Sequence, residues 1–421
     1  MSTQLILNPE VLQQIDRIKA TDILVGIPSY NNARTIGHVI RAVTVGLAKY
    51  FPDYRSIIVN SDGGSKDETS RVVHQSTIED SRLIMFSQPA GPITKIITPY
   101  HGIPGKGSAF RTIFQIAENL NAKVCVVVDS DLRSITPEWI ELLIKPVLNE
   151  QFDYVSPYYL RHKYDGTITN SIVYPLTRAL YGKRIRQPIG GDFGFSGRLA
   201  SHFLTKDVWE SDVARFGIDI WMTTTAVAEG YKVCQSFLGA KIHDAKDPGS
   251  DLSAMLVQVV GAVFNLMETY EPVWCSVSGS EPCPIFGFPF EVGLEPVNVN
   301  LDRMIAAFRQ GVKDLGDIWS QFLSEKIMAT LKALAQDDAS SFHFPDAVWA
   351  RTVYEFAVAH YKRRMERSHL IKSLTPLYLG RTASFVIETQ HSTAAEVENK
   401  LELLCLEYEN LKPYLVEKWR G

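Results

Sequence analysis

Short apolar runs alternate with stretches of helical periodicity along the first third of the chain, and this alternation constrains the fold more than any other feature of the sequence. Residues 22–27, 55–60 and 123–128 each form an apolar run of the length of a buried strand. Between these runs, apolar side chains recur at helical spacing from Ile36 to Leu47 and over residues 108–119. Strands that alternate with helices predict an α/β fold with a mostly parallel sheet and helices on both faces, whose ligands bind at the carboxyl ends of the strands.

Local signals predict the remaining elements of this α/β region. Asn8 followed by Pro9 predicts a capped helix near the start of the sequence. Ser65 with Glu68 predicts a capping box that opens the helix after the second strand. We expect residues 83–86 to form a further strand and the Pro- and Gly-rich segment 88–105 to form a loop.

The sequence changes character near Ser250. Apolar residues at helical spacing from Leu252 to Val263 begin a long helix, and residues 301–419 show mostly helical periodicity. We therefore expect an α/β domain with an N-terminal helix over residues 1–250 and a helical domain over residues 251–421. The apolar spacing of the helical domain indicates a core or a dimer interface, and we expect a homodimer.

Composition argues against several classes of protein. Lys plus Arg number 43 against 47 Asp plus Glu, so the formal net charge of −4 gives no overall attraction to nucleic acid. The five cysteines include no CxxC pair, which favours a reducing compartment and plain thiols at Cys275 and Cys283. The sequence shows no signal-peptide pattern and no apolar stretch of the roughly 20 residues that a membrane helix needs. We expect a soluble cytoplasmic protein that binds no nucleic acid and does not span a membrane.

Two carboxylates directly follow the third apolar run, in the order Asp129-Ser130-Asp131. Such a pair is able to hold a divalent cation, which in turn binds a pyrophosphate. The structural alternative is an acidic turn that precedes the helix beginning at Thr136 and Pro137.

Two further polar segments lie near the expected strand ends. Asp62 precedes two glycines and suits the N–H edge of a nucleotide base, whereas the structural alternative is an Asx turn with a helix cap. Lys106 lies between two glycines at a helix N-terminus, a position that suits a phosphate through charge, dipole and exposed N–H groups. A solvated loop lysine is the alternative for Lys106.

Together these segments resemble glycosyltransferases of the GT-A fold, of the broad family-2-like kind. The similarity extends from about Asp22 to Leu256 as a set of ordered motifs. Within that kind, the later motifs resemble the group of mannosylglycerate synthase and glucosyl-3-phosphoglycerate synthase. The matching segments are residues 27–32 for the opening strand and loop, 60–69 for the nucleotide segment, 129–131 for the metal motif, and 187–192, 216–219 and 241–243 for the narrower group.

The resemblance implies a role for each matched residue. Asp131 and His243 would be the protein ligands of Mg²⁺ or Mn²⁺. The residues implied to bind the nucleotide, its diphosphate and the donor sugar are Pro28, Tyr30, Asn31, Asp62, Lys106, Asp129, Ser130, Gly190 and Gly191. The implied catalytic positions are Asp129, Ile189, Asp192 and Asp219, and the implied acceptor positions are Arg161, Gly166, Thr167, Thr169 and Asp219.

The resemblance further implies a metal-dependent transfer of glucose or mannose, with retention, from a nucleoside-diphosphate sugar to a small hydroxy acid such as glycerate or 3-phosphoglycerate. The acceptor hydroxyl would enter on the face that the diphosphate leaves, through an oxocarbenium-like transition state, and a phosphate oxygen would take its proton. Three alternatives stay open. They are an inverting transferase with another acceptor and Asp192 as base, a nucleotidyltransferase, and an inactive nucleotide-binding scaffold.

Two positions depart from the pattern of the resembled group. Asp192 replaces a glutamate that usually follows the paired glycines. Residues 166–169 read Gly-Thr-Ile-Thr where the glucosyl-3-phosphoglycerate synthases have an arginine after the glycine, so a bidentate clamp for an anionic acceptor is lost. Thr169 is able to bind a carboxylate, and the segment from Arg161 to Lys163 supplies positive charge close by.

Overall fold

The computed structural model describes residues 7–76, 93–100, 104–242, 253–290, 293–339 and 341–421, which form two compact units. The sheet unit comprises the described parts of Met1–Leu160, Ile189–Asp244 and Cys283–Leu294, and the helical unit comprises those of Arg161–Pro188, Ala245–Pro282 and Glu295–Gly421. The sequence analysis placed one boundary near residue 250, whereas the units exchange two segments. Residues 161–188 join the helical unit, and residues 283–294 add a strand to the sheet.

The sheet unit is built on a sheet that has eight strands in the described part of the chain, in the order β10-β8-β5-β7-β4-β1-β2-β3. Neighbouring strands run parallel except at β7, which is antiparallel to both β4 and β5. The predicted α/β fold with a mostly parallel sheet is therefore confirmed. The strands are β1 (Ile23–Ser29), β2 (Ser56–Asp62), β3 (Thr94–Pro99), β4 (Val124–Val127), β5 (Tyr154–Leu160), β7 (Phe193–Ser196), β8 (Val233–Ala240) and β10 (Ile285–Phe286).

The three apolar runs at residues 22–27, 55–60 and 123–128 form β1, β2 and β4, as predicted. The loop predicted over residues 88–105 is wrong at β3, and the strand predicted at residues 83–86 lies outside the described residues. β3 is the edge strand next to β2, so only its Ile96 and Thr98 side chains are buried and its sequence lacks a continuous apolar run. Pro99, which favoured the loop, ends this edge strand, where proline is tolerated.

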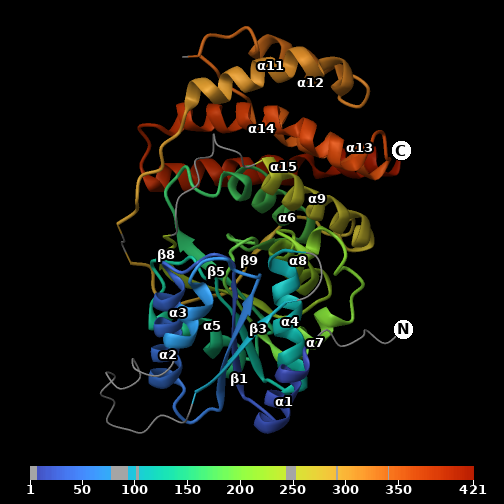
Figure 1. Cartoon of the computed structure of the whole chain (residues 1–421). Helices are drawn as coiled ribbons and strands as arrows, with labels where there is room; N and C mark the ends of the chain where they lie inside the picture. Colours follow the sequence, from blue (N-terminus) through green and yellow to red (C-terminus); the bar gives the residue numbers. More distant parts are fainter. Residues whose placement is uncertain (1–6, 77–92, 101–103, 243–252, 291–292, 340) are drawn as a thin grey trace. The chain divides into compact units, whose positions relative to one another are not determined.

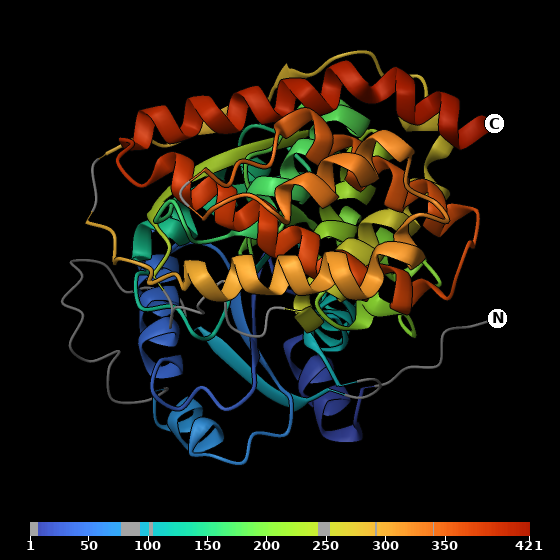
Figure 2. The same cartoon turned by 90° about the horizontal axis from the view of Figure 1, so that it is seen from above.

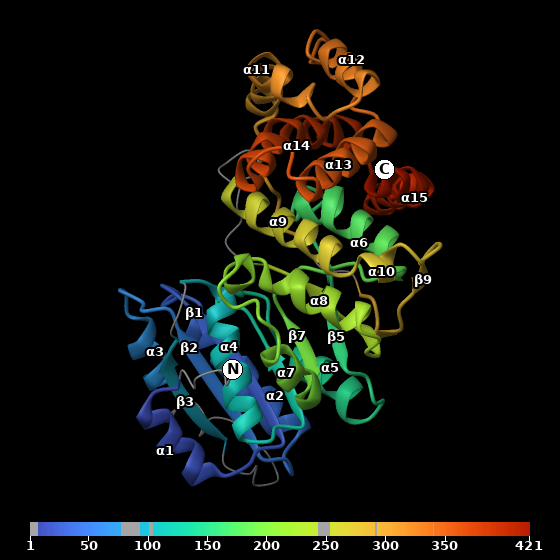
Figure 3. The same cartoon turned by 90° about the vertical axis from the view of Figure 1, so that its right-hand side faces the viewer.

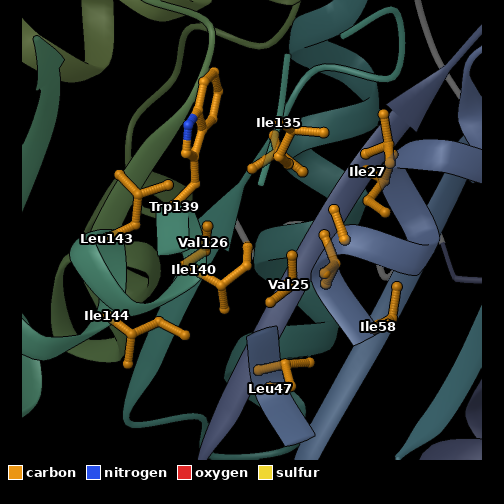
Figure 4. Close-up of a cluster of buried hydrophobic side chains, with 14 of the residues drawn as sticks. Val25, Ile27, Leu47, Ile58, Val126, Ile135, Trp139, Ile140, Leu143 and Ile144 are labelled. Atoms are coloured by element: carbon orange, nitrogen blue, oxygen red, sulfur yellow. The ribbon is translucent and has the colours of Figure 1, made fainter. Parts of the chain in front are cut away.

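Helices cover both faces of this sheet (Figures 1 and 3). α2 (Ile36–Tyr50) and α5 (Pro137–Leu148) pack together on one face, and α4 (Lys106–Asn119) and α7 (Gly197–Leu204) pack together on the other. Figure 4 shows the core on the first face, where Val25 and Ile27 of β1 and Ile140 and Leu143 of α5 are all fully buried. The sheet unit also contains α1 (Pro9–Ile18), α3 (Thr69–Gln75) and α8 (Ile218–Ala228).

The helical unit stacks its helices in layers (Figures 1 and 3), as its sequence periodicity predicts. α11 packs on α14, α14 on α13, α13 on α15, and α15 on α6. Figure 2 shows α15 in red as one long helix that ends at the C-terminus. Its helices are α6 (Tyr174–Tyr181), α9 (Ser253–Thr269), α10 (Glu271–Trp274), α11 (Leu301–Trp319), α12 (Glu325–Leu334), α13 (Asp346–Tyr361), α14 (Arg367–Thr389) and α15 (Ala394–Arg420), with a π-helical turn at Thr169–Val173.

A buried ion-pair network explains why residues 161–188 belong to the helical unit. The side chain of Arg178 on α6 is fully buried, and it pairs with Glu402 and Glu409 of α15. The Arg178 Nε to Glu409 Oε1 distance is 2.6 Å. Because a guanidinium buried without its carboxylates would be strongly destabilising, these ion pairs hold α6 to α15 within the helical unit.

Replacing two helical glycines by alanine should change the free energy of unfolding in opposite directions. A Cβ added at Gly46 of α2 would lie 2.7 Å from the Pro137 carbonyl oxygen and 2.8 Å from Ile140 Cβ, whereas a Cβ at Gly316 of α11 would meet nothing within 4 Å. We expect Gly46→Ala to lower the free energy of unfolding by about 1–3 kcal/mol through overpacking. We expect Gly316→Ala to raise it by up to about 1 kcal/mol through helix propensity. Chemical denaturation of both variants measures these changes, and changes of the same sign would contradict the described α2–α5 crossing.

Candidate active site

The loops that follow β1, β2 and β4 meet at the carboxyl edge of the sheet. The Asn31 N–H donates to Ser65 Oγ at 2.9 Å, and Asn31 Oδ1 accepts from the Lys66 N–H at 2.9 Å. Asn32 Oδ1 accepts from the Ser130 hydroxyl at 2.8 Å. Asn31 has a φ of 54°, a left-handed conformation that asparagine tolerates better than most residues. Three segments of the predicted donor site are therefore joined by hydrogen bonds.

Asp62, at the end of β2, holds the turn that follows it. Its Oδ2 accepts from the N–H groups of Gly64 at 3.1 Å and Ser65 at 2.9 Å, and its Oδ1 accepts from the hydroxyls of Ser29 at 3.0 Å and Ser65 at 2.6 Å. This is the Asx turn that the sequence offered as the structural alternative. A nucleotide base would have to replace one of the two hydroxyls as a donor to Asp62.

The capping box predicted at Ser65 is wrong. α3 begins at Thr69 with Glu68 at its cap position, three residues later than a Ser65 cap requires. The Ser65 hydroxyl is instead shared between the Asp62 carboxylate, to which it donates, and the Asn31 N–H, from which it accepts. A cap would need the Ser65 oxygen to accept from an N–H of the first helical turn, but that oxygen accepts from the Asn31 N–H and the helix begins only at Thr69.

Two tyrosine rings converge over Gly63. A Cβ added at Gly63 would lie 3.1 Å from the Tyr100 ring and 3.2 Å from the Tyr30 ring. Tyr30 is 56% exposed. The Tyr100 hydroxyl accepts from the Gly105 N–H at 3.0 Å, which ties the end of β3 to the start of α4. Aromatic rings at such an edge are suitable stacking surfaces for a nucleobase.

Asp129, the first carboxylate of the 129–131 motif, lies between two lysines. Lys106 Nζ is 2.8 Å from Asp129 Oδ1, and Lys241 Nζ is 2.7 Å from Asp129 Oδ2. Lys106 also lies 3.1 Å from Asp219 Oδ1 on α8, and Lys241 lies 2.9 Å from Asp192 Oδ2. The five groups form one charged cluster at the carboxyl edge of the sheet.

Asp192 binds both Asp129 and Lys241 of this cluster. It is fully buried, its Oδ1 accepts from the Asp129 N–H at 2.8 Å, and its Oδ2 accepts from Lys241 and from the Tyr159 hydroxyl. Both carboxylate oxygens are thus bound by the protein. The arrangement orients Asp129 and Lys241, and it presents no oxygen of Asp192 to an acceptor.

The pKa values of Asp129 and Asp219 shift in opposite directions. Burial acts to raise the pKa of Asp129, but Lys106 and Lys241 outweigh it and hold that pKa well below its usual range. At Asp219 the effect of burial prevails over Lys106, and the pKa is raised. Burial acts to lower the pKa of Lys106, but the neighbouring carboxylates raise it above that of an ordinary lysine. Asp129 is therefore the fixed anion of the pair, and Asp219 is the carboxylate closer to exchanging a proton.

The paired glycines lie directly against Asp129. Gly191 has a φ of 87°, and a Cβ added there would lie 2.0 Å from Asp129 Oδ2. The Gly190 carbonyl accepts from Lys241 at 2.8 Å, and the Gly191 carbonyl lies 3.5 Å from Lys106 Nζ. The structure thus brings the turn of residues 189–192 to the same edge as the 129–131 motif.

The residues implied to bind the metal are only partly described. Asp131 lies on the exposed side of the loop after β4, and His243 lies outside the described residues. The chain just before His243 is bound to that loop: the Arg133 N–H donates to the Ile242 carbonyl at 2.9 Å, and the Ile242 N–H donates to Ser134 Oγ at 2.9 Å. Within the described ranges, no group of three or more His, Cys, Asp or Glu side chains is placed to hold a metal ion. A carboxylate and an imidazole are suitable donors for Mg²⁺ or Mn²⁺, so the residues fit the metal in chemistry.

The implied acceptor residues other than Asp219 belong to the helical unit, where three of them lie together. A Cβ added at Gly166, which has a φ of 67°, would lie 3.5 Å from Arg161 Nη1 and 4.0 Å from Thr169 Oγ1. Arg161 Nη1 also lies 3.5 Å from Asp165 Oδ2. Thr167 instead shares a hydrogen bond with the Tyr378 hydroxyl of α14.

Lys163 does not supply charge to these acceptor residues. Its ammonium group donates to the carbonyl oxygens of Thr389 at 2.6 Å and Gln390 at 3.0 Å. These are the last carbonyls of α14, which otherwise have no partner within the helix, and a lysine at a helix C-terminus is favoured there. Of the positive charge that the sequence predicted near the acceptor, Arg161 and His162 therefore remain. Burial lowers the pKa of His162, which disfavours its charged form.

Sequence reasoning missed the roles of Lys241 and Tyr100. Lys241 follows β8 directly, so the rule that strand ends carry functional side chains was sufficient to find it. Tyr100 follows β3, the strand that was predicted as loop, so the same rule had no strand end to start from.

A family model described as the GT domain of mannosylglycerate synthase matches residues 36–265, which is more than half of the chain. The chain belongs to this family. The protein is therefore a glycosyltransferase, and the resemblance stated from the 27–32, 60–69 and 129–131 motifs is confirmed. Among the described helices, none has both the length and the apolar character that crossing a membrane requires.

The relatives of this glycosyltransferase include glucosyl-3-phosphoglycerate synthase of Petrotoga mobilis, which is 25% identical over 280 residues that cover 62% of this chain and 78% of that protein. Similar solved structures include glucosyl-3-phosphoglycerate synthase of Mycobacterium tuberculosis with Mn²⁺, UDP and phosphoglyceric acid, at 21% identity, a TM-score of 0.42, and coverage of 61% of this chain and 82% of that one. The complex of the same enzyme with Mg²⁺ and UDP has 19% identity, a TM-score of 0.43, and coverage of 62% and 83%.

The contact between Gly191 and Asp129 predicts a large effect of one methyl group. Gly191→Ala and the control Gly230→Ala both place alanine at a positive φ, but a Cβ at Gly230 would meet nothing within 4 Å. We expect both variants to lose about 1 kcal/mol or more of stability from the backbone conformation. Only Gly191→Ala displaces the Asp129 carboxylate, so its sugar-transfer rate should fall by about 100-fold or more while the Gly230→Ala rate stays near wild type. Wild-type turnover by Gly191→Ala would contradict the described packing.

Proposed function

We propose that this glycosyltransferase moves a hexose, with retention and with Mg²⁺ or Mn²⁺, from a nucleoside-diphosphate sugar to a small hydroxy acid such as glycerate or 3-phosphoglycerate. The observation that carries the proposal is the charged cluster at the carboxyl edge of the sheet, in which Asp129 is held ionised between Lys106 and Lys241. The relative from Petrotoga mobilis, a glucosyl-3-phosphoglycerate synthase, supports this acceptor class. Family membership supports hexosyl transfer.

The donor nucleotide is proposed to bind across the ends of β1, β2 and β3. Its base stacks on Tyr30 and Tyr100 over Gly63, and Asp62 accepts from the base in place of a serine hydroxyl. The diphosphate binds Lys106 at the start of α4, where the helix dipole favours an anion; the Gly107 N–H of this turn is already bound to the Arg215 carbonyl at 3.2 Å. The donor sugar lies against the Gly190–Gly191 turn, where the absence of side chains allows close approach.

Asp131 and His243 are the residues that would hold the metal ion. When bound, Mg²⁺ or Mn²⁺ supplies positive charge that offsets the charge of the departing diphosphate. Lys106 contributes to the same charge balance from the protein side, and Asp129 orients the donor sugar through its fixed position. Asp219, with its raised pKa, accepts from a sugar or acceptor hydroxyl.

Retention is supported by the state of Asp192. An inverting transferase needs a carboxylate base within hydrogen-bond reach of the acceptor hydroxyl. Asp192 was the candidate for that role, but both of its oxygens are bound by the protein and its side chain is fully buried. In the retaining reaction no enzyme base is required, because an oxygen of the leaving phosphate takes the proton.

The first test measures nucleoside diphosphate release from UDP-, GDP- and ADP-sugars, with Mg²⁺ or Mn²⁺ against EDTA, and with glycerate or 3-phosphoglycerate. We expect metal-dependent release from one donor that one of these acids stimulates. NMR of the product then determines whether the anomeric configuration is retained. Release that no added acid stimulates would reject the acceptor class, and an inverted product would reject the mechanism.

A second prediction concerns the metal ligands. Asp131→Ala and His243→Ala should each lower metal-dependent turnover by at least about 100-fold and should raise the metal concentration needed for half-maximal rate. Asp53→Ala removes an exposed carboxylate from the turn that follows α2 and serves as the matched control with near wild-type behaviour. Wild-type rates of the Asp131 or His243 variant at limiting metal would refute the assignment.

A third prediction separates two cations of the acceptor region. Arg161→Met should raise the KM for the acid acceptor by about 10- to 100-fold, because a charged hydrogen bond is lost, and should leave the KM for the donor unchanged. Lys163→Met removes the interactions at the C-terminus of α14, so it should lower thermal stability without changing the acceptor KM. An equal change of the acceptor KM in both variants would contradict the separation of the two roles.

A further inference from the structure

Lys241 is a buried lysine that connects three segments of the sheet unit. It is the first residue after β8, and its side chain is 4% exposed. Its ammonium group contacts Asp129 Oδ2 at 2.7 Å, the Gly190 carbonyl oxygen at 2.8 Å and Asp192 Oδ2 at 2.9 Å. These three oxygens match the three N–H donors of an ammonium group, and they come from the loop after β4 and from the segment before β7.

The two lysines of the cluster have different surroundings. Lys106 is 15% exposed, begins α4 and contacts Asp219 as well as Asp129. Lys241 contacts the other oxygen of Asp129, together with Asp192, which is fully buried, and its Nζ lies 5.3 Å from the centre of the Tyr159 ring. The exposure and the partners of Lys241 are those of an internal support rather than of a group that meets a ligand.

We propose that Lys241 is a positioning residue of the transfer reaction: it fixes the Asp129 carboxylate and the Gly190–Gly191 turn against each other and does not bind the diphosphate. The proposal rests on the proposed function for its kinetic test, but its structural content concerns this chain alone. Gly191 leaves no room for a side chain between its backbone and Asp129 Oδ2, so the turn lies in direct contact with the carboxylate. Lys241 bonds both within 2.8 Å, whereas Lys106 bonds Asp129 at 2.8 Å and reaches the Gly191 carbonyl only at 3.5 Å.

The alternative is that Lys241 only neutralises Asp192. In that case removal of both charges together should restore normal behaviour, since replacing a buried ion pair by uncharged groups is often neutral or stabilising. The double variant Lys241→Met with Asp192→Asn performs this replacement with little change of volume. The double variant therefore separates charge balance at Asp192 from the contacts of Lys241 with Asp129 and Gly190. It also keeps the test possible if Lys241→Met alone fails to fold.

The experiment compares Lys241→Met, Lys241→Arg, the Lys241→Met/Asp192→Asn double variant and Asp192→Asn alone with wild type. Measured quantities are kcat, donor KM, the Kd for the nucleoside diphosphate with metal, and the melting temperature. We expect the double variant to regain most of the melting temperature that Lys241→Met loses, while kcat stays about 100-fold or more below wild type and the nucleotide Kd changes by less than about threefold. Lys241→Arg should recover part of kcat, because a cation is retained at the same place.

Two controls define the contrast. Lys232→Met removes an exposed lysine at the opposite end of β8 and should behave as wild type. Lys106→Met should weaken the nucleotide Kd, as a group that contacts the diphosphate does. The proposal is overturned if the double variant turns over within about fivefold of wild type, or if Lys241→Met weakens the nucleotide Kd as strongly as Lys106→Met.

A crystal structure of the double variant tests the proposal without turnover. We expect the Asp129 carboxylate to leave its position beside Gly191 and the Gly190 carbonyl to reorient. If both keep their places, Lys241 does not position them, whatever the reaction is. A wild-type enzyme that is inactive on every donor would therefore defeat the proposed function, and the crystal structure would still decide the role of Lys241.

Discussion

The pairing of one carboxylate, Asp129, with two lysines is the interaction on which the carboxyl edge of the sheet depends. Each charge is largely removed from water, so each needs its partners in place. The partners come from different parts of the fold: Lys106 begins α4, Lys241 follows β8 and Asp192 precedes β7. The cluster therefore exists only when these elements are assembled in the observed strand order.

The antiparallel strand β7 is essential to this assembly. In a parallel neighbour of β4, residues that precede the strand lie at the opposite edge from Asp129. Because β7 runs antiparallel, with Phe193 paired to Val127, the residues just before it reach the edge where β4 ends. Gly190, Gly191 and Asp192 are thereby brought to Asp129. The sequence predicted a mostly parallel sheet, and no local pattern distinguished the short apolar run of β7 as its antiparallel member.

The sequence predicted those parts of the site that follow from strand ends. Asp62 and Asp129 were selected because they stand at the ends of apolar runs, and Lys106 because it lies between two glycines at a helix N-terminus. The structure places all three at the carboxyl edge. Sequence reasoning failed where a side chain finds a partner that is distant in the sequence. Ser65 has the spacing of a helix cap, yet its oxygen accepts from the Asn31 N–H, and the spacing alone carries no information about that partner. Lys163 has the charge of an anion binder, yet its position at the end of α14 depends on a packing partner more than 200 residues away, as the separation of 226 residues from Thr389 shows.

The charge balance of the cluster explains how donor binding can prepare the acceptor side of the proposed reaction. Three carboxylates, Asp129, Asp192 and Asp219, surround two ammonium groups, and Lys106 divides its charge between Asp129 and Asp219. A diphosphate that draws Lys106 toward itself weakens the ion pairs of Lys106 with Asp129 and with Asp219. Asp129 keeps Lys241 as a second cation and stays in place, whereas Asp219, whose pKa burial already raises, loses the charge that opposed burial. A hydrogen bond from a hydroxyl then stabilises the Asp219 carboxylate more than before. When the substrates are bound, a sugar or acceptor hydroxyl supplies this hydrogen bond. Lys241 is thus what allows Lys106 to change partners without moving Asp129.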